Sequence, residues 1–438
     1  MSGLRKLLTW LVLLALMAAF GVGVNRYLAS HDGAAFAAAK DPTQVHVASR
    51  LTLPGTIYFA DGGGLFALTG SKVTQLQKQG QGWTQPVLLP DGSGLLAVKV
   101  TANYYSDLYE LSLTGTVEEQ LSHNSGQVTV TELGNDDWIY YPAVGPGNSL
   151  YFSYDWPKGD VDDPSECCYQ VDLSIWETKL GTQINRSDVE NGNGITQESW
   201  ANYYTGGDVS PLPLAGGGLV YVDYEDAYGD TGELSTPLAG AVPGSEISQI
   251  RMDPTPNPYG TGAGIPLTQP GDDCAQPALN PAQTEMAMIC TPVVNGAPSS
   301  TESDLVVASF DAATDTIGPL DRLVTGTMAA SPAWSPDGTG LIYEAPEAGD
   351  GYMELWYIKG AAPLAPSPKA AATPTSSATG TVSPTPSAKA AATPTPSATG
   401  TATPTPTPKA VVTPIPSAPL QITSNLDLDG SAPVWASH

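Results

Sequence analysis

Carboxylates are the side chains of this sequence with the greatest capacity for chemistry, because they gather in short segments. Asp160, Asp162 and Asp163 lie in one such segment, which begins at Asp155 and ends at Glu166. Like charges at this spacing repel one another unless water solvates them or a cation bridges them. Calcium prefers carboxylate oxygens, so the segment is interpreted either as a solvated loop or as a loop stabilised by calcium at Asp160, Asp162 and Asp163.

Two further acidic segments are weaker candidates for a calcium site. The segment from Asn425 to Gly430 places oxygen-bearing side chains at alternate positions, as calcium loops do. Its twelfth position is Ala436, where such a loop needs a bidentate glutamate. The segment from Tyr221 to Glu233 is interpreted as the first one is, either as a solvated acidic loop or as a loop stabilised by calcium. No cofactor is therefore predicted, and calcium is the one ion that the sequence leaves open.

Nucleophilic and metal-centred catalysis lack the residue patterns that they require. The sequence contains no Gly-x-Ser-x-Gly elbow, no P-loop and no His-Glu-x-x-His pattern. Its four histidines are scattered along the chain at His31, His46, His123 and His438. We predict no catalytic residue from these motifs.

The cysteines are candidates for disulfides. Cys274 and Cys290 flank a predicted hairpin, 275–289, so a bridge between its two strands is expected in an exported protein. Cys167 and Cys168 are adjacent, and both a vicinal disulfide and two free thiols fit that spacing. A zinc site is not favoured, since there is no Cys-x-x-Cys pair to begin a set of four ligands.

Aromatic side chains between residues 138 and 204 form a candidate binding platform. About half of them must pack between strands. Four lie in segments that are expected to be loops, namely Trp156, Trp200, Tyr203 and Tyr204. Flat aromatic rings of this kind bind sugars or peptides when several of them converge.

The N-terminal segment predicts where the chain resides. Arg5 and Lys6 precede an uncharged run, 7–24, whose 18 residues would span about 27 Å as a helix. Basic residues before such a helix keep its N-terminal side in the cytoplasm, so a single-pass cell-membrane protein with an extracytoplasmic remainder is expected. The alternative is a cleaved signal peptide with a small-residue site at 35–37, which would give a secreted protein.

Internal repeats determine the expected fold. The sharpest copy, 331–343, reads Ser-Pro-Ala-Trp-Ser-Pro-Asp-Gly-Thr-Gly-Leu-Ile-Tyr, and a second copy spans 85–96. Each unit predicts a short strand, a Pro-Asp-Gly turn, a second strand, and then two more strands. Weaker copies begin near residues 141, 210, 276 and 432. Four short antiparallel strands in each repeat are typical of propeller blades.

The motif Pro-x-Trp-Ser-Pro-Asp-Gly, followed by a strand, Leu-Trp/Tyr and then Leu-Thr, resembles the TolB-type, WD-like propeller repeat. The resemblance covers about 50–360 and 419–438. It implies a propeller fold. It does not imply one function, since such repeats serve binding, scaffolding and enzyme-regulating roles alike.

Counting repeats predicts an all-β, six-bladed β-propeller closed by its C-terminal strand. The first blade contains only three predicted strands, 56–59, 65–68 and 73–76, and the segment 432–435 supplies the missing innermost strand. Such pairing removes an exposed strand edge. We expect the propeller to be monomeric.

The domain boundaries follow from these assignments. Residues 1–24 form the anchor or signal segment, 25–50 a flexible stalk, and 51–360 blades 1 to 6. Residues 361–418 form a Pro/Thr/Ala-rich disordered insertion, with a repeat of about 20 residues, and 419–438 complete the last blade and the first. Whether the insertion is O-glycosylated or an unmodified spacer stays open.

The function predicted from the sequence is a protein- or glycan-binding scaffold module without catalysis. A net charge of −27 repels phosphate backbones and excludes a nucleic-acid partner. The alternative is a glycan-acting hydrolase or lyase using acidic loop residues at the propeller axis. Two carboxyl groups about 5–10 Å apart in an axial pocket with aromatic flanks would favour that alternative.

Overall fold

The computed structural model describes most of the predicted propeller. The described residues are 46–47, 53–101, 105–124, 138–155, 170–171, 173–184, 194–196, 200–201, 207–227, 238–241, 245–256, 264–347, 351–360, 417–424 and 426–437. They lie in one compact unit formed by 1–363 and 416–438, and a second unit is formed by 364–415. Among the described residues, no helix is both long and apolar enough to cross a bilayer. The expected anchor, 1–24, lies outside them.

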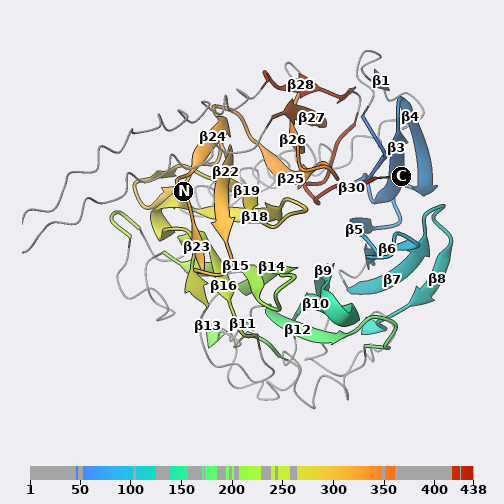
Figure 1. Ribbon diagram of the computed structural model, residues 1–438, viewed down its shortest axis with the longest axis horizontal. Coiled ribbons are helices and arrows are strands. Elements are labelled where there is room, and N and C mark those ends of the chain that lie inside the picture. Colours follow the sequence, from blue (N-terminus) through green and yellow to red (C-terminus); the bar gives the residue numbers. More distant parts are fainter. Residues whose placement is uncertain are drawn as a thin grey trace, which may run out of the picture. The chain divides into compact units, whose positions relative to one another are not determined.

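Six antiparallel sheets form the blades, and in Figure 1 they follow one another around a common centre. The innermost strands are β30 (Val434–Ala436), β5 (Trp83–Leu88), β9 (Ile139–Val144), β14 (Gly207–Pro213), β18 (Cys274–Leu279) and β25 (Ala330–Trp334). The second strands are β2 (Thr56–Asp61), β6 (Gly94–Val100), β10 (Ser149–Tyr154), β15 (Leu219–Asp226), β19 (Glu285–Cys290) and β26 (Gly340–Pro346). Each sheet contacts the next along the chain, and β25 of blade 6 contacts β30 of blade 1.

The outer strands complete the sheets. The third strands are β3 (Gly64–Thr69), β7 (Ser106–Ser112), β12 (Ser174–Lys179), β16 (Glu246–Asp253), β22 (Asp304–Asp311) and β27 (Met353–Lys359). The fourth strands are β4 (Lys72–Gln77), β8 (Val117–Gln120), β17 (Ile265–Pro266), β24 (Asp321–Val324) and β28 (Leu420–Gln421). Apolar side chains from the central strands fill the spaces between neighbouring blades.

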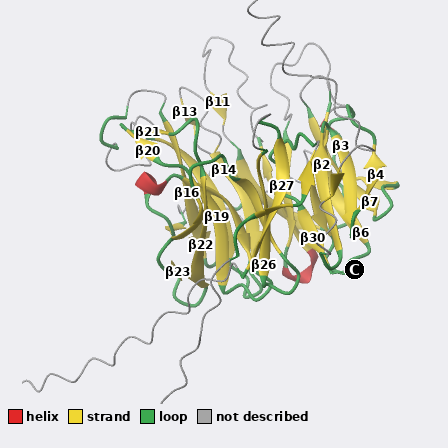
Figure 2. Cartoon of the chain, turned by 90° about the horizontal axis from the view of Figure 1, so that it is seen from above, coloured by secondary structure: helices red, strands yellow, loops and turns green. Residues whose placement is uncertain are grey.

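Short pairs lie outside these sheets. They are β1 (His46–Val47) with β29 (Thr423–Ser424), β11 (Gln170–Val171) with β13 (Trp200–Ala201), and β20 (Val293–Val294) with β21 (Ala297–Pro298). Residues 46–47 belong to the expected stalk, so at least this part of it is paired with blade 6. Figure 2 shows the blade strands running between two faces, with β11, β13, β20 and β21 at the same face.

The Ser-Pro-Asp-Gly motif forms a capped turn between an inner strand and the next strand. Ser335 Oγ donates a hydrogen bond to Asp337 Oδ1 over 2.6 Å, and the same carboxylate oxygen accepts from the Thr339 amide over 3.0 Å. Gly338 has a φ of 68°, which an L side chain rarely adopts. The repeat therefore requires these residue types because each one satisfies the turn.

The Leu-Thr motif of the fourth strand has an equally local cause. In four blades a serine or threonine that follows a buried leucine or isoleucine accepts a hydrogen bond from a third-strand amide. The pairs of acceptor and donor residue are Ser122 and Leu108, Thr196 and Ile175, Thr268 and Ile250, and Thr423 and Leu355, at 2.8–3.0 Å. Each hydroxyl accepts a hydrogen bond from a buried third-strand amide that has no backbone acceptor on the outer strand.

A β-bulge interrupts five of the six innermost strands at the residue before a proline. These residues have φ between 49° and 54° and are Gln85, Tyr141, Ser210, Gln276 and Ser331. A bulge inserts an extra residue into a strand and thereby changes the direction in which the side chain at that position points. Here Gln85 Oε1 accepts from the Tyr141 amide, and Gln276 Oε1 accepts from the Ser331 amide, each over 2.7 Å. The bulges thus join consecutive blades near the axis.

The last strand of the described chain lies in the first sheet. β30 pairs antiparallel with β2, so that Trp435 lies opposite Ile57. The indole Nε1 of Trp435 donates to the Pro54 carbonyl over 2.7 Å. Trp334 occupies the matching place on β25 and donates to the Ala278 carbonyl of blade 5 over 3.0 Å.

Candidate functional site

A pocket of about 390 Å³ opens between blades 4, 5 and 6. Its wall combines the start of β16, the start of β18, the residues before β25 and the segment between β19 and β22, which includes β20 and β21. The pocket therefore lies at the face of the propeller where β20 and β21 are found (Figure 2). Loops of this kind on a rigid scaffold commonly carry binding residues.

Asp273 is the buried acid of this pocket. It follows the short 3-10 helix Pro270–Asp272 and has a φ of 43°, a conformation that aspartate tolerates better than most residues. The amide and the hydroxyl of Ser248 donate to its Oδ1 over 2.6 and 2.9 Å. Burial raises the pKa of the Asp273 carboxyl, and the hydrogen bonds from Ser248 and Thr291 partly oppose that shift.

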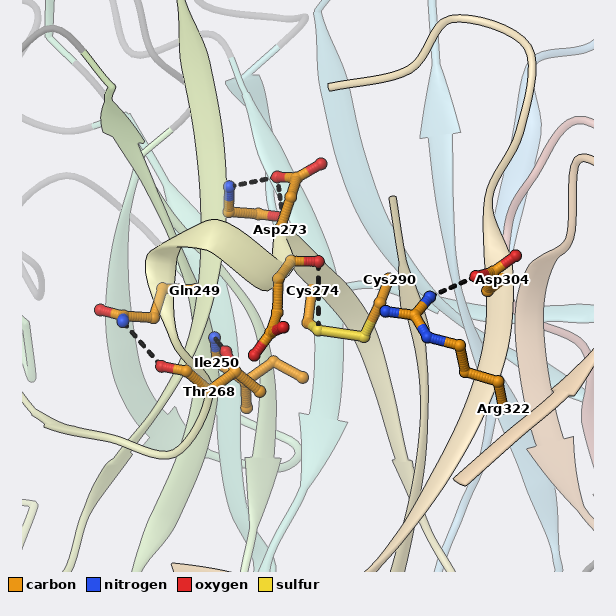
Figure 3. Close-up of a disulfide and its surroundings, with 10 residues drawn as sticks. Gln249, Ile250, Thr268, Asp273, Cys274, Cys290, Asp304 and Arg322 are labelled. Carbon is orange, nitrogen blue, oxygen red and sulfur yellow. Dashed lines mark hydrogen bonds and ion pairs between the residues drawn. A yellow bond between two sulfur atoms is a disulfide. The ribbon is translucent and has the colours of Figure 1, made fainter. Parts of the chain in front are cut away.

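A disulfide fixes the strands behind this acid. Cys274 and Cys290 lie directly opposite each other on β18 and β19 and are bridged. Both cysteines are fully buried, and Asp273 precedes the first of them (Figure 3). The Thr291 amide donates to the Asp273 carbonyl over 2.9 Å, so both pocket residues are held to the bridged pair.

The polar lining of the pocket is acidic. Glu246 and Glu302 lie on its exposed rim, and Asp273 lies at its buried end. The lining residues include no lysine, arginine or histidine. Burial raises the pKa of the Tyr224 hydroxyl far above its usual range, and negative charge on Tyr141, Asp273 and Glu246 adds to the shift. The Tyr224 hydroxyl therefore keeps its proton near the carboxylates of Asp273 and Glu246.

Apolar groups complete the lining. Met328 is 48% exposed at the rim, and Met353 is half-buried. A ligand with one positive group and an apolar body would match both parts of this surface, because methionine adapts to varied apolar shapes.

Most of the site residues predicted from the sequence lie outside the described residues. This holds for Trp156, Tyr203, Tyr204, the calcium candidates Asp160, Asp162 and Asp163, and the pair Cys167 and Cys168. Trp200 was expected in a loop, and its backbone forms β13 with Ala201. Within the described residues, no group of three or more His, Cys, Asp or Glu residues is arranged to hold a metal ion.

The acidic segment that begins at Tyr221 is a strand for its first six residues, not the loop that its charge suggested. Asp223 and Glu225 are buried on β15 and flank Arg251 of β16, whose Nη1 donates to them over 2.8 and 3.0 Å. A buried arginine thus neutralises charge that the sequence pattern assigned to solvent.

No pattern in the sequence indicates the pocket residues as a group. Glu246 begins β16, Asp273 precedes β18 and Glu302 precedes β22, and only the packing of neighbouring blades brings them together. Gln276 at the pocket wall carried a local signal, since it stands before the proline of a repeat, but its bond to Ser331 depends on the bulge.

No protein-family model matches the chain. No curated protein matches it. Among solved structures it is similar to TolB from Acinetobacter baumannii, with 16% identity, a TM-score of 0.41, and coverage of 68% of this chain and 60% of that one. It is also similar to a TolB from Agrobacterium tumefaciens described as putative, with 13% identity, a TM-score of 0.41, and coverage of 68% and 88%.

A third similar structure is an enzyme, a puromycin-hydrolysing peptidase of Mycobacterium tuberculosis. The identity is 11%, the TM-score 0.39, and the match covers 64% of this chain and 38% of the peptidase. The chain thus spans three fifths of the Acinetobacter TolB and less than half of the peptidase. Likeness at this level concerns the fold and assigns no activity. The strand order defines the class, a six-bladed all-β propeller.

Proposed function

We propose that the protein is an extracytoplasmic binding module whose pocket between blades 4, 5 and 6 takes a positively charged segment of a protein partner. The observation that supports this proposal is the acidic lining, in which Glu246, Asp273 and Glu302 occur together and the described lining residues include no lysine, arginine or histidine. The net charge of −27 would also attract such a partner over longer distances. An N-terminal anchor at 1–24 would hold the module outside the cytoplasmic membrane.

The C-terminal strand has a part in this proposal. A ring keeps its pocket geometry only while neighbouring blades stay in place, and the pairing of β30 with β2 joins the two ends of the propeller. We propose that this pairing closes the ring in solution. Deletion of the strand, described in the Discussion, tests it.

Binding of a fluorescent lysine-rich peptide to the full chain tests the charge of the pocket. Glu246→Gln and Glu302→Gln should each weaken the peptide about three- to fivefold, because each removes roughly 1 kcal/mol of attraction at the exposed rim. Raising the salt concentration should weaken wild-type binding further. Fluorescence anisotropy at two salt concentrations measures both effects.

Glu118→Gln is the matched control for this experiment. Glu118 is exposed on β8, the outer strand of blade 2, and its substitution changes the net charge by the same amount. Binding should stay at the wild-type level in this variant. Equal losses in all three variants would show a general charge effect and contradict a site in the pocket.

A glycan-acting hydrolase is the second candidate. The lining of the pocket favours it specifically, since it brings several carboxyl groups together in one cavity, and glycoside hydrolysis uses a pair of them. Asp273, whose pKa is raised by burial, would be the acid. Reducing-sugar release from a panel of polysaccharides is the test. Release by the wild type that Asp273→Asn abolishes would favour the enzyme, and no release by the wild type would contradict it.

A further inference from the structure

One buried carboxylate, Glu344, distinguishes blade 6 from the other bulged blades. In each of these five blades, the residue before the bulge pairs with one residue of the second strand. Those partners are Val98, Ser153, Val222, Ile289 and Glu344 in blades 2 to 6. The first four partners are apolar residues or a serine, which a buried strand position favours. The fifth, Glu344, has an ionisable side chain.

Glu344 is fully buried and lacks hydrogen-bond partners. Its exposed fraction is 0%, and neither carboxylate oxygen has a partner within the described residues. Ser431, which follows Gly430 in the segment leading to β30, also has a buried hydroxyl without a partner. An ionised carboxylate in such a place is strongly disfavoured relative to its neutral form.

Among the described residues, the charged groups that act on Glu344 are acidic. Its neighbours across the sheet are Ala330 and Leu355, which are apolar. The charged groups that act on it are Asp61, at the end of β2, and Asp429, in the segment leading to β30. Burial raises the pKa of Glu344 well above its usual range, both carboxylates add to the shift, and the Gly430 amide partly opposes it.

Two neighbouring carboxylates hold the same segment by ordinary hydrogen bonds. Glu354 accepts from the Leu426 amide over 2.7 Å, and Asp61 accepts from the Asp427 amide over 2.9 Å. We define the segment 426–436 and its contacts with blades 1 and 6 as the seam. Acids thus contact the seam at three points. At Glu344, unlike the other two, no donor within the described residues lies at hydrogen-bond geometry, and the Gly430 amide acts on it more weakly.

We propose that the seam is a pH-sensitive latch, closed while Glu344 is protonated and loosened when Glu344 ionises. Ionisation would place a third negative charge beside Asp61 and Asp429 in a buried space. Loosening the 426–436 segment would admit water to that charge. The blade 6 end of the ring, and with it the wall of the pocket formed by blade 6, would then respond to external pH.

The direction of the effect follows from proton linkage. A glutamate has a pKa of about 4.3 in an unfolded chain, and that of Glu344 is higher in the folded protein. Its contribution to stability is full below the unfolded value and is lost as pH rises toward the folded value. The protection of the seam should therefore fall by up to about tenfold for each pH unit in that window.

Hydrogen–deuterium exchange of the full chain, followed by mass spectrometry from pH 5 to 9, measures this effect locally. The exchange rate of peptides from 426–436, corrected for the intrinsic rate, is divided by the corrected rate of β14 in the same molecule, and this ratio is followed with pH. In the wild type the seam should lose protection relative to β14 as pH rises. In Glu344→Gln, which is neutral at every pH, the ratio should stay constant.

Two further variants keep the test decisive. Glu344→Val introduces the residue found at this position in blades 2 and 4, and it should also remove the pH dependence if the glutamine variant folds poorly. Glu285→Gln is the control, because the pKa of Glu285 is also raised by burial but this residue lies on β19 of blade 5. It should leave the pH dependence of the seam intact.

Three outcomes would overturn the latch. The first is a wild-type ratio that does not change from pH 5 to 9. The second is a pH dependence that persists in both Glu344 variants. The third is restoration of seam protection at pH 8 by millimolar calcium in the wild type alone, which would make Glu344 a cation ligand instead of a proton site.

Discussion

The two innermost strands are held together differently in blade 5 and in blade 1. In blade 5, β18 and β19 are joined by a short turn, and their cysteines, 16 residues apart, are bridged. In blade 1, Trp435 pairs with Ile57 on a strand that begins the propeller, with no covalent link between them. The first pair is held locally, whereas the second depends on all the other blades being folded.

This difference predicts where the ring is weakest. Closing a long loop costs only slowly more entropy as its length grows, so the distance along the chain is not the main difficulty for blade 1. The larger difference is chemical, because three buried or partly buried acids contact the segment that leads to β30, whereas a disulfide lies at the matching place in blade 5. The seam should therefore open before the blade 5 hairpin does.

Deleting residues 426–438 should have the largest effect on this comparison. The deletion removes Leu426, Leu428 and Trp435, which are buried in the cluster between blades 6 and 1. Each large buried side chain contributes about 2–5 kcal/mol, so the unfolding temperature should fall on the order of 10 °C. Differential scanning calorimetry of the full chain and the truncated chain measures the change.

The control is removal of residues 365–416, all but the last of which belong to the second unit. The unfolding temperature should change by about 2 °C or less in this variant. Equal tolerance of the two deletions would argue against closure of the ring by the C-terminal strand.

The repeated motifs made most of the fold predictable from the sequence. The Pro-Asp-Gly turn and the Leu-Thr ending each contain their own hydrogen-bond partners, as Ser335 with Asp337 and Thr268 with Ile250 show. Motifs that are satisfied locally can be recognised without knowing the tertiary structure. Six blades and the pairing of Cys274 with Cys290 followed from such local patterns.

The pocket could not be predicted in the same way. Its carboxylates lie at the start of β16 and in the segments before β18 and β22, and their proximity depends on how neighbouring blades pack. The burial of Asp223 and Glu225 could not be predicted either, because they lie in an acidic stretch whose composition indicates exposure to solvent. Arg251, which neutralises them, lies on the next strand, beyond a separate connection. Glu344 also looked like one polar residue at the end of an apolar strand.

Removing the disulfide should have an intermediate effect. Replacing both Cys274 and Cys290 by alanine opens a loop whose ends are 16 residues apart. The free energy of unfolding should fall by about 3 kcal/mol. Urea unfolding of the double variant measures that loss, and a reducing agent should produce a similar loss in the wild type but none in the variant. An unchanged midpoint in the reduced wild type would show that the bridge does not stabilise blade 5.

The smallest loss of stability should come from removing a hydroxyl that accepts a hydrogen bond from a third-strand amide. The size of this loss should differ between the seam and blade 4. Thr268→Val removes one hydrogen bond to the Ile250 amide and should cost about 1 kcal/mol. Thr423→Val removes the matching bond to Leu355 and also the bond that its hydroxyl donates to buried Glu354 over 2.8 Å.

Loss of a donor to a buried carboxylate costs more than loss of a bond between neutral groups. Thr423→Val should therefore cost about 2–3 kcal/mol. Urea unfolding of the two variants measures the difference between their free energies of unfolding. Equal losses in the two variants would show that the acids beside the seam do not distinguish it from blade 4.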